Sequence, residues 1–116
     1  FVPKIASYKI LDVAEAIAPD AKHEIIGIRP GEKLHEEMIT MTDAMNTVEF
    51  DDYYVILPST KMWDIEKFRN ESNSSIGKMC DFGFSYDSET NEPLLTVEEI
   101  RNLISNSDRL KEYPEF

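Results

Sequence analysis

Residues 27–39 read Gly-Ile-Arg-Pro-Gly-Glu-Lys-Leu-His-Glu-Glu-Met-Ile and are the most informative stretch of the chain. The three isoleucines around its start predict a buried strand over His23–Ile28. A proline and a glycine then turn the chain sharply after Arg29. We expect a helix rich in acidic residues from Gly31 to about Thr40, with Leu34 and Met38 on one face. This arrangement would aim one positive charge and one carboxylate at the same small ligand.

Arg29 is the first candidate binding residue. Pro30 favours an extended backbone at Arg29, and a guanidinium suits bidentate contact with phosphate oxygens. The expected helix beginning just beyond would add free N–H groups that favour an anion. The alternative is an arginine that only pairs with a nearby glutamate.

Glu32 is the second candidate, and it has two interpretations. In the first turn of a helix a carboxylate is favoured without any function. As a ligand residue it would accept hydrogen bonds from vicinal hydroxyls, such as those of a ribose. His35 lacks the second histidine or further glutamates that zinc and di-iron motifs require. We therefore expect no metal site and no catalytic residue in this chain.

The other segments predict an α+β fold with about three helices and a few short strands. Phe1–Ile5 is expected to be extended, and apolar spacing predicts a helix from about Tyr8 that Pro19 ends. A short helical piece or turn over Thr42–Asn46 and paired strands over Asn46–Phe50 and Asp52–Leu57 follow. Thr96 and Glu99 form a capping box that opens a last helix, with Val97, Ile100, Leu103 and Ile104 inward.

Composition narrows the class of protein. The 116 residues suit one domain, which we place at 1–105 with a polar tail at 106–116. A net charge of -11 disfavours nucleic acid as the partner, although one arginine can still bind a small anion. The single Cys80 and the lack of a signal peptide or membrane span favour a cytoplasmic location. The chain opens without methionine, as if a strand were already under way, and we expect a piece of a longer protein.

Several motifs together carry a family resemblance. They are Phe1-Val2-Pro3-Lys4-Ile5, Ile28-Arg29-Pro30-Gly31-Glu32-Lys33-Leu34-His35-Glu36, Glu49-Phe50-Asp51-Asp52-Tyr53-Tyr54, Gly83-Phe84-Ser85-Tyr86 and Leu95-Thr96-Val97-Glu98-Glu99. The chain resembles the C-terminal part of inverting UDP-N-acetylglucosamine 4,6-dehydratases, in the polysaccharide-biosynthesis branch of the extended short-chain dehydrogenase/reductases. Residues 59–80 match this pattern least well.

The resemblance implies a two-part, homo-oligomeric enzyme. An N-terminal Rossmann domain, absent here, would hold NADP and the catalytic groups, and this smaller domain would bind the UDP-sugar. The implied reaction oxidises C4, eliminates water across C5 and C6, and returns the hydride with inversion at C5. It would begin pseudaminic acid synthesis for surface polysaccharide or flagellin glycans. Arg29 would meet the diphosphate and Glu32 the ribose hydroxyls.

Two alternatives stay open beside this interpretation. One is a non-catalytic interaction or regulatory domain that retains the fold. The other is the same domain of a related UDP-sugar dehydratase or an epimerase. In every case the chain alone lacks a Gly-x-Gly-x-x-Gly loop, so we expect no cofactor bound to it and no activity on its own.

Overall fold

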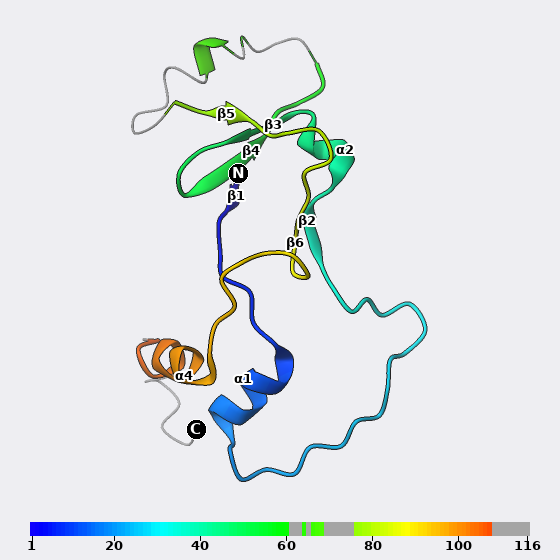
Figure 1. Ribbon diagram of the computed structural model, residues 1–116, viewed down its shortest axis with the longest axis vertical. Coiled ribbons are helices and arrows are strands. Elements are labelled where there is room, and N and C mark those ends of the chain that lie inside the picture. The colour runs from blue at the N-terminus through cyan, green and yellow to red at the C-terminus, as the bar shows by residue number, and fades with distance from the viewer. Residues whose placement is uncertain (61–63, 65, 69–75, 108–116) are drawn as a thin grey trace. The chain divides into compact units, whose positions relative to one another are not determined.

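The computed structural model describes residues 1–60, 64, 66–68 and 76–107. The chain divides into two compact units (Figure 1). One contains Phe1–Ile5 and Leu34–Thr90, and the other contains Ala6–Lys33 together with the chain from Asn91 onward. Most of the expected tail at 106–116 lies outside the described residues. Short helices and strands alternate in both the sequence and the structure, which confirms the predicted α+β class.

The first unit is built on a sheet with the strand order β1-β4-β3-β5, in which every neighbouring pair is antiparallel. Its strands are β1 (Val2–Pro3), β3 (Thr47–Glu49), β4 (Tyr53–Ile56) and β5 (Lys78–Met79). The predicted β3–β4 pair is confirmed, with Val48 opposite Val55. β1 lies at an edge of the sheet, where the missing N–H of Pro3 costs least.

Both faces of this sheet carry apolar side chains, because neighbouring residues of a strand point to opposite faces. Tyr54 belongs to one buried cluster and Val55 to another. The first cluster consists of Ile39, Ala44, Tyr54 and Tyr86, and the second of Val48, Phe50, Val55 and Leu57. The short helix α2 (Met41–Ala44) begins at Thr40, whose side chain accepts a hydrogen bond from the Asp43 N–H. It supplies Ala44 to the first cluster. It overlaps the short helical piece or turn that was predicted over Thr42–Asn46.

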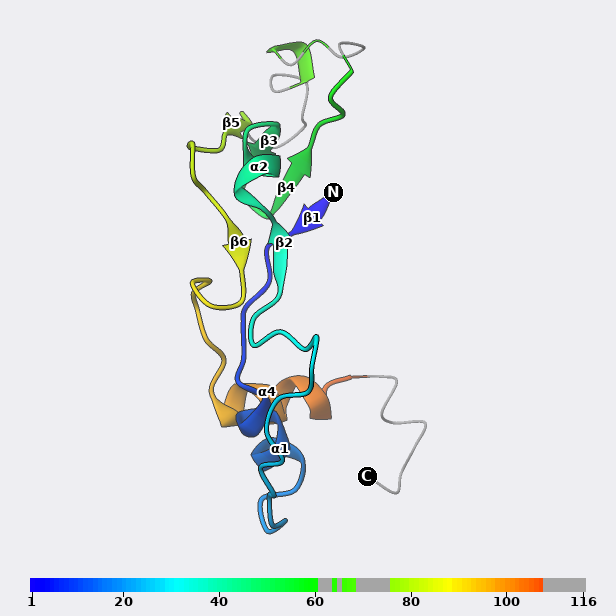
Figure 2. The ribbon, with the colours of Figure 1, turned by 90° about the vertical axis from the view of Figure 1, so that its right-hand side faces the viewer.

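A second, two-stranded sheet pairs β2 (Glu37–Ile39) with β6 (Tyr86–Asp87) (Figure 2). The Tyr86 hydroxyl ties this pair to the start of the chain. It accepts a hydrogen bond from the Ile5 N–H at 2.7 Å and donates one to the Ile5 carbonyl at 3.1 Å. These two hydrogen bonds join residues 81 positions apart in the sequence within the first unit.

The second unit packs helix α1 (Ile10–Ile17) against helix α4 (Val97–Ser105), with Ala16 and Ile100 buried. Segments from the two ends of the chain are joined here by hydrogen bonds from Ser7 N–H to the Pro93 carbonyl and from Leu95 N–H to the Ser7 carbonyl. Both helices were predicted from local patterns. Ile100 points inward as expected, but the Leu103 side chain is exposed.

The capping box predicted at the start of α4 is confirmed. The Thr96 side chain accepts from the Glu99 N–H at 3.3 Å, and the Glu99 carboxylate accepts from the Thr96 N–H at 2.8 Å. These hydrogen bonds hold the pKa of Glu99 below its usual value, with the bond from the Thr96 backbone as the largest cause.

Replacing Thr96 with alanine is expected to lower the free energy of unfolding by about 0.5–2 kcal/mol, the usual cost of losing an N-cap side chain. Urea unfolding followed by circular dichroism measures this change. Thr60→Ala, at an exposed threonine outside the helices and strands, is the matched control and should leave the midpoint almost unchanged. Equal midpoints for Thr96→Ala and the unaltered chain would show that the cap does not limit stability.

The strand predicted over His23–Ile28 is wrong. These residues form no helix or strand and belong to a long loop between α1 and β2 (Figure 1). Residues Ile25, Ile26 and Ile28 are 86%, 73% and 58% exposed. A strand needs a neighbour for its N–H and C=O groups, and no segment of the described residues pairs with this one.

The helix predicted from Gly31 to Thr40 is also wrong. Gly31 adopts a left-handed backbone with φ +87°, and the chain then pairs as strand β2. This pairing buries Ile39 completely, whereas Leu34, on the expected apolar face of a helix, is 82% exposed. Burial of Ile39 through long-range pairing outweighs the local helical spacing, because local propensity is only a weak preference.

Candidate functional site

The segment Arg29–Glu32 forms a tight turn within the second unit. The Glu32 N–H donates to the Arg29 carbonyl at 3.1 Å, which closes the turn around Pro30 and Gly31. A proline at the second position and a left-handed glycine at the third are the features of a type II turn. The predicted turn is therefore confirmed, and it places Arg29 and Glu32 side by side.

The Glu32 carboxylate folds back over this turn. One of its oxygens, Oε2, accepts a hydrogen bond from the Arg29 N–H at 2.8 Å, and the other, Oε1, lies 3.8 Å from Arg29 Nε. The two side chains are 72% and 49% exposed, so their ion pair is solvated and contributes little to stability. The simple arginine–glutamate pairing that was the alternative to ligand binding is thus present. In this ion pair, Glu32 approaches only the Nε atom of the Arg29 guanidinium.

The anion-binding features of this turn differ from those expected. Residues 32–40, directly after Gly31, form no helix, so the aligned N–H groups of a helix N-terminus are not available at the turn. What remains is an exposed guanidinium at the end of an apolar segment. Among the described residues it has no side-chain partner other than Glu32. Its donors are therefore open to a phosphate or carboxylate from outside the chain.

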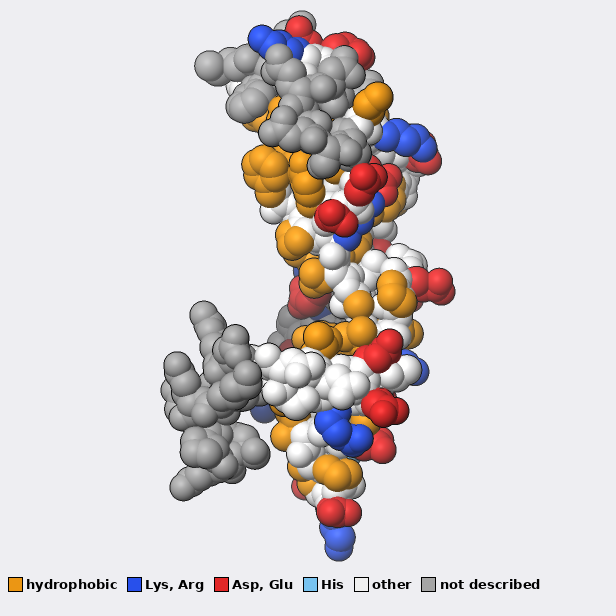
Figure 3. Space-filling model, turned by 90° about the vertical axis from the view of Figure 1, so that its left-hand side faces the viewer, with side chains coloured by type: hydrophobic (Ala, Val, Ile, Leu, Met, Phe, Trp, Pro, Cys, Tyr) orange, Lys and Arg blue, Asp and Glu red, His pale blue; other side chains and the backbone are white. Residues whose placement is uncertain are grey.

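His35, three residues beyond Glu32, lies in the first unit and is exposed. In the described part of the chain, no three or more His, Cys, Asp or Glu side chains gather as a metal site would require. Acidic side chains are scattered along the face that Figure 3 shows and do not form a single field. No single acidic patch is therefore visible on that face.

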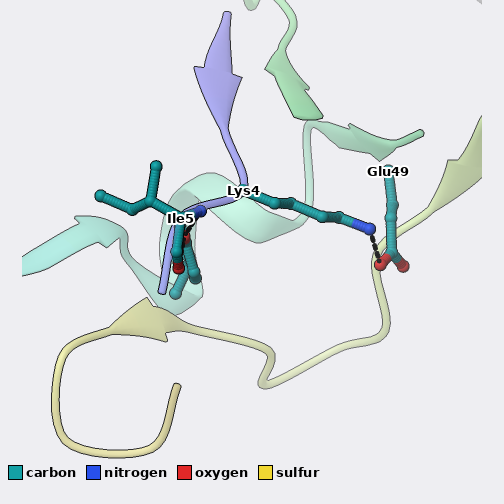
Figure 4. Close-up of polar contacts among 4 residues, drawn as sticks. Lys4, Ile5 and Glu49 are labelled. Carbon is teal, nitrogen blue, oxygen red and sulfur yellow. Dashed lines mark hydrogen bonds and ion pairs between the residues drawn. The ribbon is translucent and has the colours of Figure 1, made fainter. Parts of the chain in front are cut away.

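A second polar cluster, in the first unit, escaped the sequence analysis. Lys4 Nζ lies 2.8 Å from Glu49 Oε1 (Figure 4) and 5.0 Å from the centre of the Tyr54 ring. Burial, followed by the Glu49 charge, raises the pKa of Tyr54 to about 12. Burial likewise raises the pKa of Cys80. Both groups stay protonated at neutral pH, so neither offers a ready base or nucleophile. The Lys4–Glu49 pair links the residue after β1 to strand β3.

Comparison with known proteins identifies the family. Residues 1–58 match the family described as polysaccharide biosynthesis protein, and this chain belongs to it. Relatives in two strains of Campylobacter jejuni, serotypes O:23/36 and O:2, bear the name UDP-N-acetylglucosamine 4,6-dehydratase (inverting). Each is 43% identical to the chain over 109 residues. The match covers 93% of this chain and 33% of each relative, so the chain spans about a third of their length.

Structural comparison agrees with this assignment of the fold. The crystal structure of Pen from Bacillus thuringiensis superimposes with a TM-score of 0.64 at 25% identity. The superposition covers 90% of this chain and 29% of Pen. None of the described helices is long and apolar enough to cross a membrane. The recognised family, the dehydratase relatives and the fold all agree with the resemblance that the motifs carry.

Proposed function

We propose that this chain is the sugar-nucleotide-binding part of an NADP-dependent, C5-inverting UDP-N-acetylglucosamine 4,6-dehydratase. The observation that carries the proposal is the 43% identity over 93% of the chain to relatives bearing that dehydratase name. The reaction would be the first step of pseudaminic acid synthesis, for surface polysaccharide or flagellin glycans. A cytoplasmic location and a homo-oligomeric complete protein are parts of the same proposal.

Within this proposal Arg29 meets the diphosphate of the UDP-sugar and Glu32 accepts hydrogen bonds from the ribose hydroxyls. Support comes from the turn that brings the two side chains together and from the exposure of the guanidinium. Planar donors match phosphate oxygens in pairs, and such charge-assisted bonds are about twice as strong as neutral ones. The Oε1 atom of Glu32, which lies 3.8 Å from Arg29 Nε, is the atom we assign to the ribose.

The residues of this chain do not fit NADP itself. Its glycines at positions 27, 31, 77 and 83 form no Gly-x-Gly-x-x-Gly loop to cradle a pyrophosphate. We therefore place NADP, together with the groups that carry out the chemistry, in a Rossmann domain from the N-terminal side of the complete protein. For this chain we propose substrate binding alone, with no activity in isolation.

The exposed isoleucines support such a partner domain. Ile25, Ile26 and Ile28 are β-branched, apolar and mostly exposed, and they lead directly into Arg29. Exposed apolar side chains this close together in the sequence favour an interaction site. We expect the amide protons of residues 24–28 to exchange with deuterium much more slowly in the complete protein than in the isolated chain. Equally fast exchange in both would argue against docking of the partner domain on this segment.

The complete protein also tests the proposed reaction. Incubation with UDP-N-acetylglucosamine and NADP, followed by NMR of the product, should reveal a 4-keto-6-deoxy sugar nucleotide inverted at C5. A product without inversion, or a 4-epimer, would favour the related dehydratase or epimerase. Nucleotide binding without any product would favour the non-catalytic interaction domain. Mass measurement of the same protein in solution tests the homo-oligomer.

A further inference from the structure

The Glu32 carboxylate is committed in part to the backbone of the residue that we assign to the phosphate. Its Oε2 atom accepts the Arg29 N–H at 2.8 Å, while the Glu32 N–H donates to the Arg29 carbonyl at 3.1 Å. The two residues therefore exchange hydrogen bonds across the Pro30–Gly31 turn. Proline already restricts the backbone of this turn, and the left-handed glycine permits its closure. The Glu32 side chain adds a further hydrogen bond that holds the turn closed.

The same carboxylate also lies beside the arginine side chain, in a solvated ion pair. Glu32 Oε1 lies 3.8 Å from Arg29 Nε, the donor nearest the backbone, and no ion pair within the described residues engages the guanidinium otherwise. A carboxylate on the Nε side leaves the outer fork of the guanidinium free for two parallel bonds to an oxyanion. Arg29 is a long, mostly exposed side chain that loses rotamer freedom on binding, and a backbone fixed by Glu32 limits the directions from which it starts.

We propose that Glu32 is a positioning residue, which fixes the Arg29 turn and thereby strengthens phosphate binding through Arg29. This inference rests on the proposed function, since it concerns the same nucleotide site, but it gives Glu32 a role beyond ribose contact. The two roles are separable because they depend on different parts of the ligand. A ribose contact needs the 2′ and 3′ hydroxyls, whereas positioning acts on the diphosphate.

The test is calorimetric titration of the complete protein with UDP and with 2′,3′-dideoxy-UDP, which carries the same diphosphate without the ribose hydroxyls. We expect Glu32→Ala to weaken binding of both nucleotides by about two- to tenfold, as for loss of preorganisation of one long side chain. Glu32→Gln should restore most binding of the dideoxy nucleotide, because its amide oxygen can still accept the Arg29 N–H. Glu15→Ala, at an exposed glutamate of helix α1 outside the turn and the docking segment, should change neither affinity.

A double-variant comparison separates positioning from a general structural effect. In the Arg29→Ala background, Glu32→Ala should weaken dideoxy-UDP binding no further, because Glu32 acts on the phosphate only through Arg29. Loss of UDP binding alone, with the dideoxy nucleotide unaffected by Glu32→Ala, would overturn the inference and leave the proposed function intact. If Arg29→Ala changes neither affinity, the phosphate assignment fails, and the inference fails with it.

Discussion

Replacing Arg29 with alanine in the complete protein is expected to raise the Michaelis constant for UDP-N-acetylglucosamine about 10- to 150-fold. A hydrogen bond to a charged group contributes about 1.5–3 kcal/mol to binding, and each 1.4 kcal/mol changes the affinity about tenfold. The turnover number should change less, because the diphosphate is remote from the reacting carbons and is held equally in ground and transition states. Steady-state kinetics over a wide substrate range measures both constants.

Two further substitutions make this result specific. Arg29→Lys keeps the charge but loses the planar fork, so its Michaelis constant should fall between those of the unaltered protein and Arg29→Ala. Lys33→Ala removes a neighbouring cation from outside the turn and should have a small effect. If Arg29→Ala and Lys33→Ala behave alike, the arginine contributes only diffuse charge. If Arg29→Ala leaves the kinetics unchanged, its assignment to the diphosphate is wrong.

The largest effect on stability is expected from Ile39→Ala, at a loss of about 2–5 kcal/mol in the free energy of unfolding. Ile39 is fully buried in β2 and packs in a cluster with Ala44, Tyr54 and Tyr86. Truncation removes buried methyl groups and leaves a cavity, because strand pairing with Tyr86 holds the surrounding backbone in place. A small domain has only about 5–15 kcal/mol of stability, so this variant should be close to unfolding at physiological temperature.

Thermal and urea unfolding of the chain, followed by near-ultraviolet circular dichroism, measures this loss. Met38→Ala is the matched control, since it truncates the neighbouring residue of the same strand, whose side chain is 46% exposed. That variant should lose much less stability than Ile39→Ala. Comparable losses in the two variants would mean that the β2–β6 pair does not anchor the core.

Local signals in the sequence predicted a substantial part of this fold. The spacing of apolar residues indicated α1, the Thr96–Glu99 pattern indicated the start of α4, and two short β-rich runs indicated β3 and β4. Each of these features depends on residues close together in the chain. The Arg29–Glu32 turn belongs with them, because proline and glycine at its centre specify its backbone without help from elsewhere.

The two wrong predictions share a different physical origin. The run His23–Ile28 has the composition of a strand, but a strand forms only when another segment takes its hydrogen bonds. Met38 has helical spacing with Leu34, yet residues 37–39 pair with β6 because this buries Ile39. Residues 23–28 find no pairing partner among the described segments, whereas residues 37–39 find one in β6, and this difference decides against the local preference in both cases.

The sequence by itself therefore determined the α+β class, the family resemblance, the two helices of the second unit and the turn that joins Arg29 to Glu32. The hydrogen bond from the Arg29 N–H to Glu32 is also local, whereas only the tertiary structure decided that Tyr86 binds Ile5 and that Lys4 pairs with Glu49. The last two contacts join residues 81 and 45 positions apart. Their formation depends on how strands pair in space, and strand pairing between distant segments leaves no local pattern in the chain.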